Sequence, residues 1–122
     1  MKGNSYRQAA WLFHLLSHQA RLRILDELRR GEACVCHLQA ILCRPQPYIS
    51  QQLRLLREAG VIESRKDGLF VYYQLADRRV EQMLEEVLGP AGEAETLPAC
   101  ACPRCQEEAM PSLSGFSVME VG

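Results

Sequence analysis

The stretch of sequence that decides the fold is QPYISQQLRLLREAGVIESRKDGLFVYYQL, residues 46–75. Its first half predicts a helix that begins near Gln46, because Pro47 is tolerated in a first turn, and that ends at Gly60. Three apolar residues recur at i, i+4 and i+7, the spacing of a buried helix face: Ile49, Leu53 and Leu56. This pattern predicts an amphipathic helix with one face in the core and the other in solvent.

The second half of the stretch predicts a β-hairpin. Residues 61–66 and 69–75 are rich in the residue types of strands, and Asp67-Gly68 lies between them. An Asp-Gly pair between two such runs is a strong signal for a two-residue hairpin turn. We therefore expect the helix to be followed directly by a small antiparallel hairpin.

Four more helices are predicted by apolar residues at helical spacing, at about 5–17, 19–30, 34–42 and 77–88. Helix, turn, helix and hairpin, in this order, are typical of a winged helix-turn-helix. The predicted fold class is therefore mainly α, with about five helices and a two-stranded wing. The predicted domain covers residues 1–90, and residues 91–122, with three prolines and little periodicity, are expected to form a flexible acidic tail.

The charge of the chain is divided unevenly along its length. Residues 1–80 carry 13 Lys and Arg against 7 Asp and Glu, whereas residues 81–122 carry 1 against 8. A basic body with an acidic tail is typical of a domain that binds a polyanion, and a solvated surface with a chance asymmetry is the alternative. Since the chain has no membrane-length apolar run and no signal-peptide pattern, we expect a cytoplasmic protein without membrane contact, its six cysteines reduced.

The helix within residues 46–75 is the predicted reading helix. The second helix of such a motif enters the major groove of DNA, where glutamine pairs with adenine and arginine with guanine. With the apolar face buried, the predicted outward side chains are Gln46, Tyr48, Ser50, Gln51, Gln52 and Arg54. Arg65 and Lys66, beside the hairpin turn, are predicted to contact phosphates or the minor groove. The sequence therefore predicts binding to double-stranded DNA.

Three segments resemble the ArsR/SmtB (arsenic-repressor-like) family of metal-sensing winged-helix repressors. They are LLSHQARLRIL at 15–25, QPYISQQLRLLREAGVI at 46–62 and DGLFVYYQL at 67–75. Many members of that family carry a glycine at the end of the third helix, where this chain has Cys43. The resemblance implies a homodimer joined through the first and fifth helices, an imperfectly palindromic operator, and release of DNA when a metal, metalloid or oxidant arrives.

The segment CVC, residues 34–36, resembles the arsenic-type motif of that family, which opens the third helix. On a regular helix the two thiols would point about 200° apart, but at an incompletely wound N-terminus they can converge on one ion. The helix dipole favours thiolates there, and the thiolate is the ligand form. A three-thiol version of the motif would need a cysteine at Gln39, so Cys34 and Cys36 lack a local third ligand. Cys43 is about 10 Å further along the helix and is predicted to be a small turn residue.

The missing ligand is predicted to come from the tail. Cys100, Cys102 and Cys105 have a chelating spacing, and the chain between Leu88 and Cys100 can extend up to roughly 40 Å. The tail would therefore reach the paired thiols of its own chain or of the partner. Arsenic(III) or antimony(III) as inducer would take three thiolates, whereas cadmium, lead or zinc would take four.

Other interpretations of the cysteines stay open. The tail cysteines would alternatively hold a separate structural zinc, Cys34 and Cys36 would be buried apolar side chains, and His37 would add a zinc ligand. A further alternative is a thiol redox or persulfide-responsive repressor. No βαβ pattern flanks the CxxC at 102–105, and no nucleophile-and-base arrangement is present, so we expect no enzyme. The predicted function is a metal- or metalloid-responsive transcriptional repressor.

Overall fold

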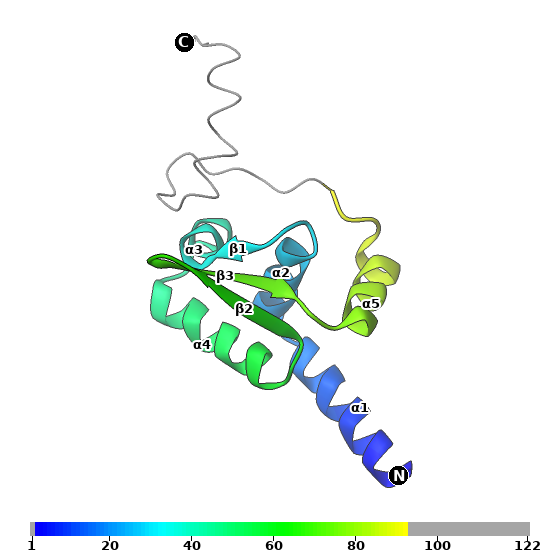
Figure 1. Cartoon of the computed structure of the whole chain (residues 1–122). Helices are drawn as coiled ribbons and strands as arrows, with labels where there is room; N and C mark the ends of the chain where they lie inside the picture. The colour runs from blue at the N-terminus through cyan, green and yellow to red at the C-terminus, as the bar shows by residue number, and fades with distance from the viewer. Residues whose placement is uncertain (1, 93–122) are drawn as a thin grey trace.

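The computed structural model describes residues 2–92, and its elements follow the predicted order (Figure 1). They are α1 (Lys2–Leu16), α2 (Gln19–Leu28), β1 (Ala33–Cys34), α3 (Val35–Leu42), α4 (Gln46–Glu58), β2 (Ile62–Asp67), β3 (Phe70–Leu75) and α5 (Arg78–Leu88). The predicted helices and the hairpin are confirmed, with boundaries close to those expected. Most of the predicted tail, residues 93–122, lies outside the described residues.

The sheet has one strand more than the sequence predicts. β1 pairs antiparallel with β3, which pairs antiparallel with β2, so the strand order is β1-β3-β2. Cys34 was expected to open a helix, but it lies in β1 opposite Tyr72, and α3 begins one residue later. A two-residue strand is too short to show period-two alternation, so no sequence pattern indicates it. Pairing of β1 with β3 therefore joins the segment before α3 to the wing.

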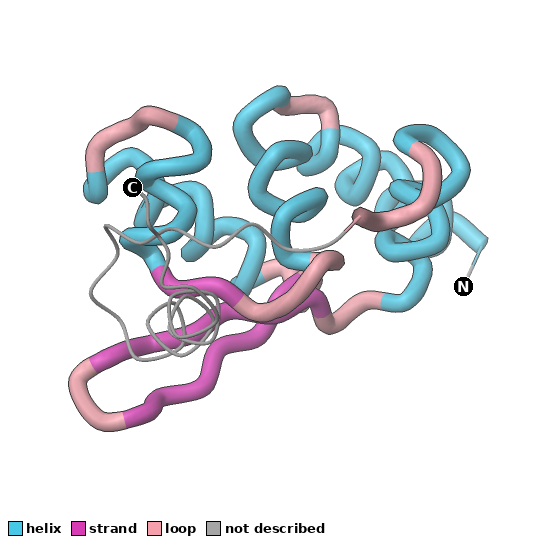
Figure 2. Tube along the Cα trace, turned by 90° about the horizontal axis from the view of Figure 1, so that it is seen from above, coloured by secondary structure: helices cyan, strands magenta, loops and turns pink. Residues whose placement is uncertain are grey.

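The turn of the hairpin lies one residue later than predicted. Asp67 pairs with Phe70, which leaves Gly68 and Leu69 as the loop. Gly68 has a φ of 63°, and a glycine with positive φ at the first loop position is the pattern of a type II′ turn. Seen from above, this loop lies clear of the helices (Figure 2). The tip of the wing is therefore exposed to a partner beyond the body of the domain.

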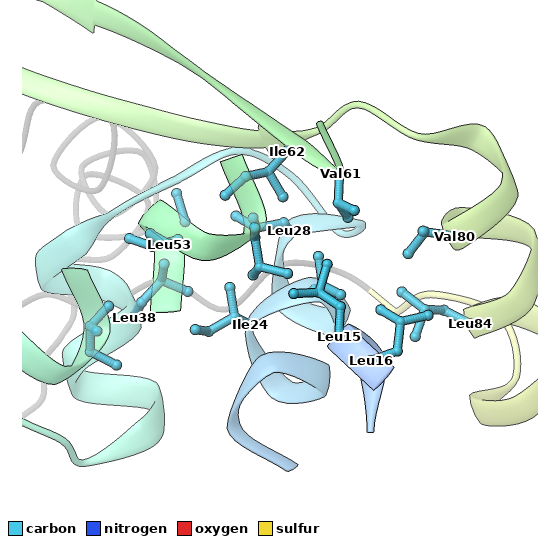
Figure 3. Packing of buried hydrophobic residues seen from close by; sticks show 14 residues of the cluster. Leu15, Leu16, Ile24, Leu28, Leu38, Leu53, Val61, Ile62, Val80 and Leu84 are labelled. Carbon is cyan, nitrogen blue, oxygen red and sulfur yellow. The ribbon is translucent and has the colours of Figure 1, made fainter. Parts of the chain in front are cut away.

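The core is built from apolar side chains of all five helices and of the segment that enters the wing (Figure 3). The predicted buried face of α4 is confirmed, because Ile49, Leu53 and Leu56 are almost completely buried. Each such side chain contributes about 1.5–3 kcal/mol through burial. This packing fixes the opposite face of α4 toward solvent. None of the helices in residues 2–92 combines the length and the apolar character that crossing a membrane requires.

Candidate nucleic-acid interface and thiol site

The outward face of α4 carries most of the predicted reading residues. Gln46, Gln51 and Arg54 are exposed, and Tyr48 and Ser50 are half-buried. Ser50, Gln51 and Arg54 line a surface hollow of about 450 Å³. Gln46 Nε2 donates a hydrogen bond to Ser50 Oγ at 2.9 Å, which links the first two turns of the helix. These side chains form one polar surface with several hydrogen-bond donors and acceptors.

Gln52 does not belong to that surface, and its predicted outward placement is wrong. Only 6% of Gln52 is exposed, and its Oε1 accepts a hydrogen bond from Arg21 Nε at 2.9 Å. Gln52 lies three residues after Ile49 and four before Leu56, which is the spacing of the buried face. The spacing predicts a buried position for Gln52, whereas the polarity of its side chain suggests an exposed one. Arg21 also donates to the carbonyl of Leu15 at 3.0 Å, so Gln52 helps to join α1, α2 and α4.

The wing presents Arg65 and Lys66 on β2, and both residues are exposed as predicted. Arg65 also has partners that the sequence did not suggest. Its Nε donates to Glu32 Oε2 at 2.9 Å, its Nη2 donates to the other carboxylate oxygen, and its guanidinium lies 4.8 Å from the ring centre of Tyr72. The hydrogen bond to Glu32 raises the pKa of Arg65 above its usual value. The wing arginine is thus held by a carboxylate two residues before Cys34.

The two cysteine sulfur atoms of the CVC segment lie together. Cys34 Sγ and Cys36 Sγ are 2.9 Å apart, because Cys34 has extended backbone angles while Cys36 is in the first turn of α3. The expected convergence at an incompletely wound helix start is therefore confirmed. Cys34 is 3% exposed and packs with Tyr72 in a small buried cluster, against which Cys36 and Phe70 lie. Cys36 is disulfide-bonded.

His37, next to the thiols, is a buried side chain that contacts a carboxylate. Its Nε2 lies 2.9 Å from Glu27 Oε2, and Arg30 Nη1 donates to the other oxygen of Glu27 at 3.2 Å. The hydrogen bond with His37 is the largest cause that lowers the pKa of Glu27, against the opposing effect of burial. This contact joins α3 to α2. The Nε2 position of His37 is therefore engaged in a structural contact, which disfavours the alternative of a zinc ligand through that atom.

Cys43 occupies the turn that the sequence predicts. It caps α3 with a φ of 56°, the left-handed region that glycine adopts most readily, and it is exposed. Within residues 2–92, no three His, Cys, Asp or Glu side chains gather closely enough to hold a metal ion. Cys100, Cys102 and Cys105 lie outside the described residues, so their part in a site stays a prediction.

Apolar side chains are exposed on the two helices nearest the ends of the described domain. On α1 they include Trp11 and Phe13, the latter 62% exposed, and on α5 they are Val87 and Leu88. The N-terminal part of α1 extends beyond the rest of the molecule (Figure 1). Exposed aromatic and aliphatic groups of this size on helices are typical of a protein–protein contact.

Comparison with known proteins points to one group of regulators. Residues 18–64 match the family described as "Bacterial regulatory protein, arsR family". A "Transcriptional repressor SmtB homolog" from Synechocystis sp. is 37% identical over 89 residues, which are 73% of this chain and 67% of the relative. The "Arsenical resistance operon repressor" of Escherichia coli is 47% identical over 68 residues, which are 53% of this chain and 56% of the relative.

The fold also matches a solved structure. Reduced HlyU from Vibrio cholerae superimposes with a TM-score of 0.67 at 30% sequence identity, covering 70% of this chain and 90% of that chain. The matched family segment contains both the CVC segment and the whole of α4.

Proposed function

Because this chain belongs to the ArsR family of bacterial regulatory proteins, which are transcriptional regulators and not enzymes, we propose that it represses transcription as a homodimer on operator DNA. A soft metal or metalloid ion bound by Cys34 and Cys36 releases the operator. The observation that carries this proposal is the 2.9 Å approach of the Cys34 and Cys36 sulfur atoms at the edge of the sheet that forms the wing.

The outward face of α4 reads the operator in this proposal. Gln46 and Gln51 suit adenine, Arg54 suits guanine, and the hydroxyl groups of Tyr48 and Ser50 donate to phosphates. Gln52 is excluded because it is buried. Arg65 and Lys66 of the wing contact phosphates, which make such binding strongly dependent on salt.

A homodimer joined through α1 and α5 would cover the exposed apolar side chains of those helices, including Phe13 and Val87. It would also place two copies of α4 about one turn of DNA apart, roughly 34–36 Å, which suits a palindromic operator. The family resemblance implies the same pair of helices.

Thiolate ligands select soft ions, and the proposed inducers are arsenic(III) or antimony(III), with cadmium, lead or zinc as the divalent candidates. A three- or four-coordinate site needs donors besides Cys34 and Cys36. We propose that Cys100, Cys102 and Cys105 supply them, from the same chain or from the partner. Among the relatives, the repressor of an arsenical resistance operon fits a site of this chemistry.

Two contacts connect the thiols with the DNA-binding elements. Cys34 is the register partner of Tyr72 on β3, and Glu32, two residues before it, holds Arg65 of β2. An ion that draws Cys34 and Cys36 toward further ligands shifts β1 and with it the wing. Couplings of this kind typically amount to about 1–3 kcal/mol, or roughly 5–150-fold in affinity.

The deciding experiment measures the affinity of the full-length protein for its operator with and without arsenite, under reducing conditions that free Cys36. We expect arsenite to weaken binding of the wild type and to leave the variants Cys34→Ser and Cys36→Ser bound. Cys43→Ser is the matched control and should respond like the wild type. Equal affinities of the wild type in both conditions, repeated with antimonite, cadmium, lead and zinc, would contradict an ion-responsive repressor.

A second candidate is a thiol redox switch, which the disulfide at Cys36 favours. In that case peroxide oxidises two thiols to a disulfide and is reduced to water, and the oxidised dimer loses the operator. Alkylation of free thiols after peroxide or polysulfide treatment, followed by mass spectrometry, separates the two candidates. Operator release that requires oxidant and does not respond to metal ions would favour the redox switch.

A further inference from the structure

A basic groove of about 500 Å³ lies beside the reading helix and shares only Tyr48 with the surface already described. Its walls come from the corner between α1 and α2, the end of α3 and the beginning of α4. The side chains that matter for its chemistry are Ser17, His18, Arg23, Arg44 and Tyr48. None of the residues between 2 and 92 that line this groove is acidic, so within that part of the chain an anion entering it meets only neutral and positive groups.

The two arginines of the groove are positioned by contacts that leave their charge uncompensated. Arg23 Nη2 donates to the carbonyl of Ile41 at 3.2 Å, and the guanidinium carbon of Arg44 lies 4.5 Å from the ring centre of Tyr48. Neither arginine forms an ion pair with a carboxylate anywhere in residues 2–92. In contrast, Arg65 and Arg79 are each paired with an acidic side chain.

The polar groups beside the arginines complete a surface of hydrogen-bond donors. His18 caps α2, where its Nδ1 accepts a hydrogen bond from the backbone N–H of Ala20 at 3.2 Å. The neutral ring therefore carries its proton on Nε2 and is a donor there. Tyr48 supplies a phenolic hydroxyl, and its ring fixes the plane of the Arg44 guanidinium. Planar guanidinium groups bind phosphate oxygens through two parallel hydrogen bonds.

The groove and the reading face both include side chains of α4. Tyr48 lines the groove, and Ser50, on the same helix, lines the hollow with Gln51 and Arg54. When the first turns of a reading helix enter the major groove, the sugar–phosphate backbone at the groove edge passes beside them. We propose that Arg23, Arg44 and His18 bind backbone phosphates of the DNA strand that flanks the α4 contact. This inference rests on the proposed function as an operator-binding protein.

The test is the salt dependence of DNA binding, measured on the full-length protein with Arg23→Ala, Arg44→Ala and the double variant. Each lost phosphate contact should reduce the slope of log affinity against log salt by about 0.9. The loss of affinity should be equal on operator and scrambled duplexes, because phosphates carry no sequence information. Arg23→Lys and Arg44→Lys should keep the slope, since a lysine retains the charge.

Arg78→Ala is the matched control, since Arg78 is an exposed arginine on α5 outside the groove, and its slope should equal that of the wild type. An unchanged slope in the double variant overturns the inference while operator binding by the wild type stands. A loss of affinity confined to the operator duplex also overturns the inference, because it would indicate that the arginines contact bases rather than phosphates. Inorganic phosphate that binds the wild type but not the double variant, with an unchanged DNA slope, would assign the groove to a small anion instead. If the wild type itself fails to bind DNA, the proposed function is what fails.

Discussion

Cys34 and Arg65 lie on the two sides of Tyr72, each as its register partner, Cys34 through β1 and Arg65 through β2. Tyr72 is almost completely buried and also packs with Cys34 in the small cluster beside the core. A movement at the thiols therefore reaches the wing across a single strand. Glu32 adds a second link, because it binds Arg65 directly.

The first prediction concerns Glu32, which competes with DNA phosphates for Arg65. Glu32→Gln should strengthen operator binding by the ion-free protein. Arg65 would then bind DNA phosphates without first breaking its ion pair with Glu32. Solvent screens an ion pair whose arginine is this exposed, so the gain should be no more than roughly fivefold. Fluorescence anisotropy at low salt measures it.

The matched control for that prediction is Glu63→Gln, because Glu63 is an exposed β2 residue that accepts a hydrogen bond from Gln74 rather than from an arginine. Glu63→Gln removes the same charge near the wing without releasing Arg65. If both variants gain equally, the effect is one of overall charge and the competition between Glu32 and DNA does not exist.

The regular elements were predictable because their signals are periodic. The buried face of α4 follows from Ile49, Leu53 and Leu56, and the wing follows from two strand-like runs around a glycine. The convergence of Cys34 and Cys36 was also predictable, since it needs only a helix start between them. These features depend on local sequence and on packing that any amphipathic helix requires.

Features that depend on distant partners were not predictable. Nothing near Cys34 indicates that it pairs with Tyr72, and nothing near Arg65 indicates that Glu32 binds it. The polarity of Gln52 predicts an exposed side chain, whereas its helical position places it on the buried face. The groove around Arg23 and Arg44 joins three helices, so only the folded chain reveals it.

The second prediction concerns Gln52 as a structural residue. Gln52→Ala removes the acceptor of Arg21 Nε in a largely buried contact and should lower the free energy of unfolding by about 1–3 kcal/mol. Its preference among operator sequences should stay that of the wild type. Gln51→Ala, one residue earlier and exposed, should do the reverse, with unchanged stability and weaker operator binding. Urea denaturation measures the stability of both variants, and competition binding measures their preference among operator sequences. A changed base preference in Gln52→Ala would show that Gln52 contributes to DNA reading.

The third prediction concerns acid stability and the carboxylate of Glu27. Its pKa in the folded protein is lowered, chiefly by the hydrogen bond with His37, from an ordinary value of 4.5. A depressed folded pKa means that the stabilisation is complete above the unfolded value and is lost as the pH falls through the folded value. Glu27→Gln should therefore be less stable than the wild type at neutral pH, with the difference shrinking below about pH 4.5.

Urea midpoints between pH 3 and pH 7 measure the Glu27 effect. Glu81→Gln is the control, because Glu81 is an exposed carboxylate on α5 that forms no ion pair within residues 2–92, and its difference from the wild type should be small at every pH. A difference between Glu27→Gln and the wild type that does not change with pH would show that the Glu27 charge makes no contribution to stability.

The fourth prediction concerns the dimer. Val87 on α5 is 78% exposed, so Val87→Glu should cost little stability in a single subunit, but it would place a charge in an apolar interface formed with α1. We expect the variant to shift toward monomer in sedimentation equilibrium and to lose operator affinity at protein concentrations where the wild type is dimeric. Leu69→Glu is the matched control, because Leu69 is 95% exposed at the wing tip and belongs to neither α1 nor α5. Leu69→Glu should remain dimeric. A fully dimeric Val87→Glu, or a monomeric Leu69→Glu, would place the subunit contact elsewhere than on α5.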